Sequence, residues 1–180
     1  IVQDLALARP HLMPAVPRIY EKIFAAFQLN SASSSAVARI VFDWSVSVGR
    51  RRAEYVNRGA PVPSLLALAD RIAHALVFSK IHARLGGRMR IMISGGAPLG
   101  REINEFFHAV GLPIYEGYGL TETTPILTSN YPGTVRLGTV GKALKGVTLR
   151  LAADGEILAR GPNVAGGYYN RPDETAEAPV

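Results

Sequence analysis

Cysteine is absent from the 180 residues, which excludes disulfides, thiolate catalysis and cysteine-ligated zinc within the chain. No apolar run reaches the roughly 18–20 residues that a membrane-spanning helix needs. No signal peptide is visible at the start, and no low-complexity tract interrupts the sequence. With 48% hydrophobic residues, the composition is typical of a globular domain that can build a core.

Acidic residues are scarce in the first half of the chain. Residues 1–90 hold 13 Lys/Arg against 5 Asp/Glu, whereas residues 91–180 hold 7 against 9. The basic half could face anionic lipid, nucleic acid or a phosphorylated cofactor, or its densest run, Arg50–Arg52, could be a solvated helix end. Aromatic residues do not interleave with the basic ones, so we expect no nucleic-acid partner.

The chain begins at Ile1 without a methionine and ends at Val180 in a polar segment. We therefore expect a piece of a longer protein. The lack of cysteine fits a reducing compartment, so a cytoplasmic location is expected, with peripheral attachment to the inner face of the membrane left open. An isolated piece would expose sheet edges, so self-association of the fragment is a further expectation.

Helical periodicity dominates residues 17–85. Pro17 suits the first turn of a helix, and a second helix is predicted from Ser35 to Asn57. A third is predicted from Leu65 to Leu85, where Gly86 and Gly87 stop it. A short strand is expected near Leu5–Ala8. The apolar stripes expected to face the core are Ile19, Ile23, Phe24 and Phe27; Val37, Ile40, Val41, Trp44 and Val48; and Leu65, Leu68, Ile72, Leu76 and Ile81.

Two short apolar runs further along the chain each end in a glycine-rich turn. Met89–Ile93 predicts a buried strand, followed by the Ser94–Leu99 turn and a helix near Arg101–Val110. Leu112–Tyr115 predicts the next strand, which leads into Glu116–Pro125. In a parallel sheet, both turns would lie at the same edge, where nucleotides bind.

The second turn carries side chains that suit a nucleotide. Tyr118 offers a flat ring for a base, and Gly117 and Gly119 let the backbone approach a ligand closely. Thr121 offers a hydroxyl for a phosphate, and Glu122 a carboxylate for a hard cation such as Mg²⁺. A plain glycine-rich turn after a buried strand is the alternative for this stretch taken alone.

After Pro125 the residue pattern favours strands and turns. Val147–Leu151 and Glu156–Arg160 alternate around Asp154-Gly155, which predicts a β-hairpin. The predicted fold is therefore α/β, with long helices flanking a mostly parallel sheet over residues 1–134. A small β-rich, barrel-like unit is expected to begin in residues 135–180.

Five motifs follow one another along the chain: Val16–Ile23, Ser94–Leu99, Tyr118–Glu122, Gly138–Gly141 and the run from Gly155 to Tyr168. In this order they resemble motifs of the ATP-dependent adenylate-forming enzymes, and in particular the long-chain fatty acyl-CoA synthetases. The first motif points to the long-chain branch, the second resembles the loop beside the adenine, and the third is similar to the central nucleotide motif. The last two resemble later core motifs.

The resemblance implies a set of site residues. Thr121 and Glu122 would be catalytic, with Thr121 holding the phosphate and Glu122 binding Mg²⁺ directly or through water. Gly95, Gly96 and Ala97 would lie against the adenine and shape the acyl pocket. The implied nucleotide-binding set is Gly95, Gly96, Ala97, Gly117, Tyr118, Gly119, Leu120 and Thr121. Phe24, Phe27, Trp44 and Phe78 are candidates for an acyl channel, but their helical spacing equally suits a core.

The resemblance implies ATP, Mg²⁺, CoA and a long-chain fatty acid as ligands, and a partial adenylate-forming fold. The family's phosphate loop, ribose-binding aspartate and catalytic lysine have no counterpart in the 180 residues, so the chain alone is expected to be inactive. Two alternatives stay open: a fatty acyl-AMP ligase that loads a carrier protein, and a non-catalytic nucleotide- or lipid-binding module.

Overall fold

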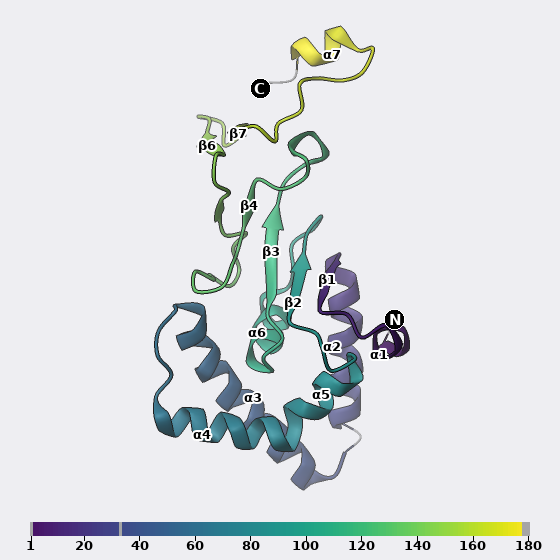
Figure 1. The fold of residues 1–180 in the computed structure, drawn as a ribbon, viewed down its shortest axis with the longest axis vertical. Helices are drawn as coiled ribbons and strands as arrows, with labels where there is room; N and C mark the ends of the chain where they lie inside the picture. Colours follow the sequence, from purple (N-terminus) through teal and green to yellow (C-terminus); the bar gives the residue numbers. More distant parts are fainter. Residues whose placement is uncertain (1, 33, 178–180) are drawn as a thin grey trace.

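Parallel strands lie at the centre of the computed structural model, which describes residues 2–32 and 34–177 (Figure 1). β1, β2 and β3 pair in parallel, and the short strands β4 and β5 extend the same sheet in antiparallel fashion. The α/β class and the mostly parallel sheet are thus confirmed. The five strands are β1 (Leu12–Ala15), β2 (Ile91–Ser94), β3 (Ile114–Tyr118), β4 (Thr128–Ser129) and β5 (Lys142–Ala143).

Helices supply most of the remaining structure. Within the described residues the α-helices are α1 (Val2–Ala8), α2 (Pro17–Ala32), α3 (Ala36–Asn57), α4 (Ser64–Ala73), α5 (Ser79–Arg84), α6 (Arg101–Ala109) and α7 (Pro172–Glu177). The predicted starts of α2 and α3 are confirmed. Ser35 caps α3, because its hydroxyl accepts a hydrogen bond of 3.3 Å from the N–H of Ala38.

Tyr20 of α2 joins the helix to two strands. Its ring is fully buried, and its hydroxyl lies 2.9 Å from the carbonyl of Met13 and 2.8 Å from that of Ile93. Burial raises the pKa of the Tyr20 phenol, so the hydroxyl keeps its proton and donates it to one of the two carbonyls. The contact fixes α2 against β1 and β2.

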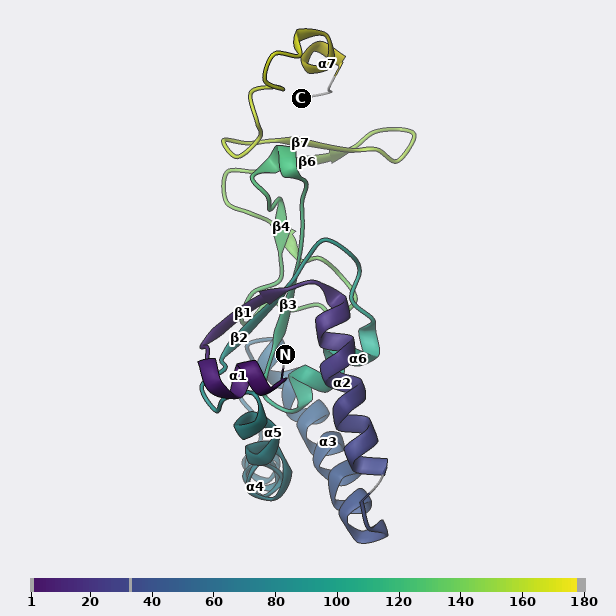
Figure 2. The ribbon, with the colours of Figure 1, turned by 90° about the vertical axis from the view of Figure 1, so that its right-hand side faces the viewer.

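Aromatic side chains of α2 and α6 form the centre of the core. The rings of Phe24 and Phe106 lie 5.0 Å apart in an edge-to-face pair, and those of Tyr20 and Phe107 lie 6.0 Å apart. Phe27 is also buried in this cluster. Figure 2 shows α2 and α6 beside the sheet. These residues pack the two helices together, so the interpretation of Phe24 and Phe27 as core is confirmed.

The strand predicted near Leu5–Ala8 is wrong, because those residues belong to helix α1. Leu5 is buried in the main core, and α1 packs against α5. The first strand follows the helix instead, at Leu12–Ala15. An apolar run this short is compatible with a strand or with a helix, so periodicity alone does not distinguish them. In the structure the run is helical and packs against α5.

The apolar stripe expected to bury α3 mostly faces outward. Val37 is 71% exposed, Ile40 67% and Trp44 41%, and only Val48 is buried. The buried residues of α3 are Ser45, Val48, Gly49, Ala53 and Asn57. Most of them are small, because α3 packs closely on α6: a Cβ placed on Gly49 would lie 2.2 Å from the carbonyl oxygen of Ala109. Large side chains could not occupy that contact.

The third predicted helix is continuous but changes its winding. α4 runs into a π-helical segment, His74–Phe78, before α5 completes it. Ala73, Phe78 and Ile81 are buried, whereas the expected core positions Leu65, Leu68, Ile72 and Leu76 are exposed. The extra residue in the π-turn rotates the buried face of α5 relative to that of α4. A prediction that assumes one α-helical period over residues 65–85 therefore places the apolar stripe on the wrong face of α4.

A separate two-stranded sheet lies beyond the carboxyl ends of β2 and β3 (Figures 1 and 2). β6 (Thr148–Leu151) and β7 (Ile157–Arg160) pair in antiparallel fashion, with Leu151 opposite Ile157, which confirms the predicted hairpin. The division of the chain at residue 134 stays a prediction. Among the described residues, no helix combines the length and apolarity needed to cross a membrane.

Replacing Gly49 by alanine should destabilise the chain. Alanine favours a helix interior over glycine by about 1 kcal/mol, but the added methyl group would overlap the Ala109 carbonyl, and overpacking of this kind costs about 1–3 kcal/mol or more. We expect a lower free energy of unfolding in urea. Gly100→Ala is the control, because a Cβ there would lie 3.6 Å from Ile103. A Gly49→Ala variant as stable as the wild type would contradict this packing.

His108 should make stability depend on pH. Its ring is buried, with Nδ1 2.9 Å from Oδ1 of Asn57 and Nε2 3.0 Å from the carbonyl oxygen of Ile114. Burial lowers the pKa of the His108 imidazole. The unfolded chain therefore binds more protons below about pH 6.5, so stability should be full above that pH and fall as the solution is acidified. Urea unfolding between pH 7.5 and 5.5 measures the slope. His108→Gln should reduce it, and an unchanged slope would refute the assignment.

Candidate nucleotide-binding site

The turns that follow β2 and β3 lie at one edge of the sheet, as expected. Ser94 at the end of β2 pairs with Glu116 in β3. A Cβ placed on Gly95 would lie 3.7 Å from the carbonyl of Gly117, so the turn after β2 lies close to the end of β3. The sheet therefore places Gly95 and Gly117 side by side, although they are far apart in the sequence.

Glu116 connects these two turns from inside the protein. Its carboxylate is buried and accepts hydrogen bonds from the Asn104 side chain at 2.8 Å and, at 3.4 Å, from the backbone N–H of Leu99. It thus links β3 to the turn before α6 and to α6 itself. Glu116 is not among the predicted site residues, and its signal in the sequence is a carboxylate directly after the apolar run Leu112–Tyr115.

Thr121–Thr123 forms a 3₁₀ turn directly after β3. The Thr123 hydroxyl accepts a hydrogen bond of 2.9 Å from the N–H of Leu120, and the chain then folds back. A Cβ on Gly119 would lie 1.9 Å from the carbonyl oxygen of Pro125, so only glycine fits there. The turn presents Thr121 and Glu122 beyond the end of the strand.

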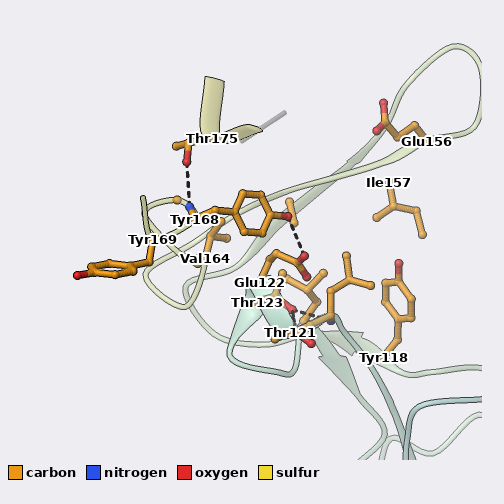
Figure 3. Close-up of a pocket in the computed structure, with 15 residues that line it drawn as sticks. Tyr118, Thr121, Glu122, Thr123, Glu156, Ile157, Val164, Tyr168, Tyr169 and Thr175 are labelled. Atoms are coloured by element: carbon orange, nitrogen blue, oxygen red, sulfur yellow. Dashed lines mark hydrogen bonds between the residues drawn. The ribbon is translucent and has the colours of Figure 1, made fainter. Parts of the chain in front are cut away.

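A cavity of about 590 Å³ lies between this turn and the hairpin side of the molecule (Figure 3). Its volume is in the range of small-molecule sites in proteins. The expected site residues that line it are Tyr118, Leu120, Thr121 and Glu122. Ile157 of β7 and Tyr168 contribute from the other side. The remaining expected residues, Gly95, Gly96, Ala97, Gly117 and Gly119, lie outside this lining.

The Glu122 carboxylate is held by a residue 46 positions later in the chain. The Tyr168 hydroxyl donates a hydrogen bond of 2.8 Å to Oε1 of Glu122 (Figure 3). Hydrogen bonds from its own backbone N–H and then from Tyr168 lower the pKa of Glu122, and the same contact raises the pKa of Tyr168. Glu122 is therefore ionised at neutral pH, as a metal ligand must be.

The donor set at the turn fits Mg²⁺ bound together with a nucleotide. Mg²⁺ keeps several waters and usually takes one or two carboxylates along with substrate phosphates. Glu122 supplies one exposed carboxylate, and it lines the cavity together with Thr121. Over the described part of the chain, no three His, Cys, Asp or Glu side chains gather into a cage that would bind a metal alone.

Comparison with known proteins agrees with this geometry. The profile of the AMP-binding enzyme family matches residues 1–169. The chain is 38% identical to a long-chain-fatty-acid–CoA ligase, FadD15, of Mycobacterium bovis, over 97% of its own length and 28% of the relative's. It is 32% identical to long chain acyl-CoA synthetase 4 of Arabidopsis thaliana, over 98% of the chain and 28% of the relative. The chain thus spans just over a quarter of these relatives.

Solved structures share the fold. A malonyl-CoA ligase with methylmalonyl-CoA and AMP bound superposes with a TM-score of 0.52 at 28% identity, over 98% of this chain and 30% of the other. An O-succinylbenzoate coenzyme A synthetase of Bacillus subtilis, in complex with AMP, reaches 0.55 at 18% identity, over 98% of this chain and 28% of the other, and that likeness concerns the fold alone. Because the family profile covers nearly all of the sequence, this chain belongs to the AMP-binding enzyme family.

Proposed function

We propose that this chain is the nucleotide-binding segment of an ATP-dependent long-chain fatty acid–CoA ligase. The observation that carries the proposal is the cavity whose wall combines Tyr118, Thr121 and Glu122, a ring, a hydroxyl and a carboxylate. The substrate class rests on the two relatives above, which are named a long-chain-fatty-acid–CoA ligase and a long chain acyl-CoA synthetase. ATP, CoA and a long-chain fatty acid are the proposed ligands, and a cytoplasmic location goes with them.

Each residue would act on a different part of ATP. The Tyr118 ring, which lines the cavity after Gly117, would support the adenine. The Thr121 hydroxyl would donate a hydrogen bond to a phosphate oxygen. Glu122 would hold Mg²⁺, which neutralises charge on the phosphates. Gly95, Gly96 and Ala97, whose turn contacts Gly117, would border the adenine from the sheet edge.

The proposed reaction has two displacements. A carboxylate oxygen of the fatty acid attacks the α-phosphorus of ATP, and the bond to the bridging oxygen of pyrophosphate breaks, giving acyl-AMP. The CoA thiol then loses its proton, its sulfur attacks the acyl carbon, and AMP leaves. Thr121 would contribute by stabilising the charge that develops on the α-phosphate oxygens in the first step.

Replacing Glu122 by glutamine in the full-length protein should greatly slow the first step, the formation of acyl-AMP. Glutamine keeps the size of the side chain but removes the charge that would hold Mg²⁺. We expect ATP–pyrophosphate exchange with palmitate to fall by about 100-fold or more. Glu102→Gln is the matched control, because Glu102 is an exposed residue on α6. If ATP–pyrophosphate exchange survives in the Glu122→Gln protein, Glu122 is not the Mg²⁺ ligand.

The 180-residue chain alone should catalyse no exchange, whereas the full-length protein should do so with a long-chain fatty acid. The chain spans 28% of its relatives, and groups beyond it would complete the reaction. Product analysis with CoA and with a carrier protein identifies the acceptor: acyl-CoA is the expected product. Acyl transfer to carrier protein alone would favour the carrier-loading ligase, and no adenylation by the full-length protein would favour a non-catalytic module.

A further inference from the structure

The segment Gly161–Tyr169 is fastened to the turn that carries Thr121 and Glu122. The Asn163 amide donates hydrogen bonds to the carbonyls of Thr123 at 2.8 Å and Ile126 at 3.0 Å. The N–H of Ala165 donates a 2.7 Å hydrogen bond to the carbonyl of Glu122. Three bonds thus join backbone groups of the turn to a segment about 40 residues away.

These bonds surround a strained position. Thr124 has φ 49° and ψ 65°, the left-handed region, which is unfavourable for a β-branched residue and unusual before a proline. Strain of this kind persists only where surrounding contacts enforce it, and it gathers at functional sites. The two carbonyls that Asn163 binds, on Thr123 and Ile126, lie on either side of Thr124 in the sequence. Asn163 therefore stabilises the strained part of the turn.

The same segment reaches the Glu122 side chain. Tyr168 is 41% exposed, and its hydroxyl donates a hydrogen bond to Oε1 of Glu122, so the contact holds one of the two carboxylate oxygens in place (Figure 3). An exposed glutamate otherwise samples several rotamers, and binding a metal would have to restrict them. The Tyr168 contact restricts them beforehand.

We propose that Tyr168 is a positioning residue for Glu122, which holds its carboxylate ready for the Mg²⁺ of a nucleotide complex. Asn163 and Ala165 keep the segment that carries Tyr168 in place. The inference rests on the proposed function, because it takes Glu122 as the magnesium ligand. Groups that orient a ligand in this way commonly change metal affinity by about 10–100-fold when removed.

The test measures ATP binding to the full-length protein by calorimetry, with Mg²⁺ and with EDTA. Tyr168→Phe removes the hydroxyl and keeps the ring. We expect the gain in ATP affinity that Mg²⁺ provides to fall by about tenfold, the lower end of that range because the contact is partly exposed. ATP affinity in EDTA should stay within about twofold. Tyr169→Phe is the matched control, since the neighbouring Tyr169 is 91% exposed and points away from Glu122 (Figure 3).

Two results would overturn the inference. One is an unchanged magnesium effect in Tyr168→Phe, and the other is an equal loss of ATP affinity with and without Mg²⁺, which would mean a merely structural role. Glu122→Gln, measured in parallel, separates this inference from the proposed function. If Glu122→Gln loses the magnesium effect and Tyr168→Phe keeps it, only the role of Tyr168 fails. If Glu122→Gln keeps it, the metal assignment itself is wrong.

Discussion

The parallel pairing of β2 with β3 is the constraint on which the site depends. Because the strands run in the same direction, both following turns emerge at one edge, with Gly95 beside Gly117. Glu116 reinforces this arrangement from within, since its buried carboxylate binds Asn104 of α6 and the N–H of Leu99. A buried carboxylate is costly unless its oxygens find donors, and here those donors are the elements that must be aligned.

The helices that pack against the sheet hold this arrangement in place. Tyr20 ties α2 to β1 and β2 through its buried hydroxyl, and Phe106 and Phe107 of α6 complete the core. The close approach of α3 at Gly49 holds α6 from its other side. The helix that begins after the Ser94–Leu99 turn is therefore fixed in place, and the turn with it.

The cavity itself joins parts that are distant in sequence. One wall is the turn after β3, and the other comes from β7 and the segment around Tyr168. Backbone strain at Thr124 and the exclusion of any side chain at Gly119 show how tightly the turn is folded. Such a turn keeps its shape because hydrogen bonds from Asn163 and Ala165 reach it. The turn that carries Thr121 and Glu122 is thus supported by a distant segment, whose Tyr168 also holds the Glu122 side chain.

The sequence by itself determined most of the helices, the glycine-rich turns after two strands, the hairpin and the family motifs, because these depend on local composition and short-range periodicity. It did not determine the first element, since it predicted a strand where helix α1 lies. The tertiary structure alone decided that α3 buries its small residues rather than Val37 and Ile40, since that choice depends on how closely α6 approaches. It also decided that Tyr168 binds Glu122. A hydrogen bond across 46 residues depends on the path of the whole intervening chain, which no local pattern records.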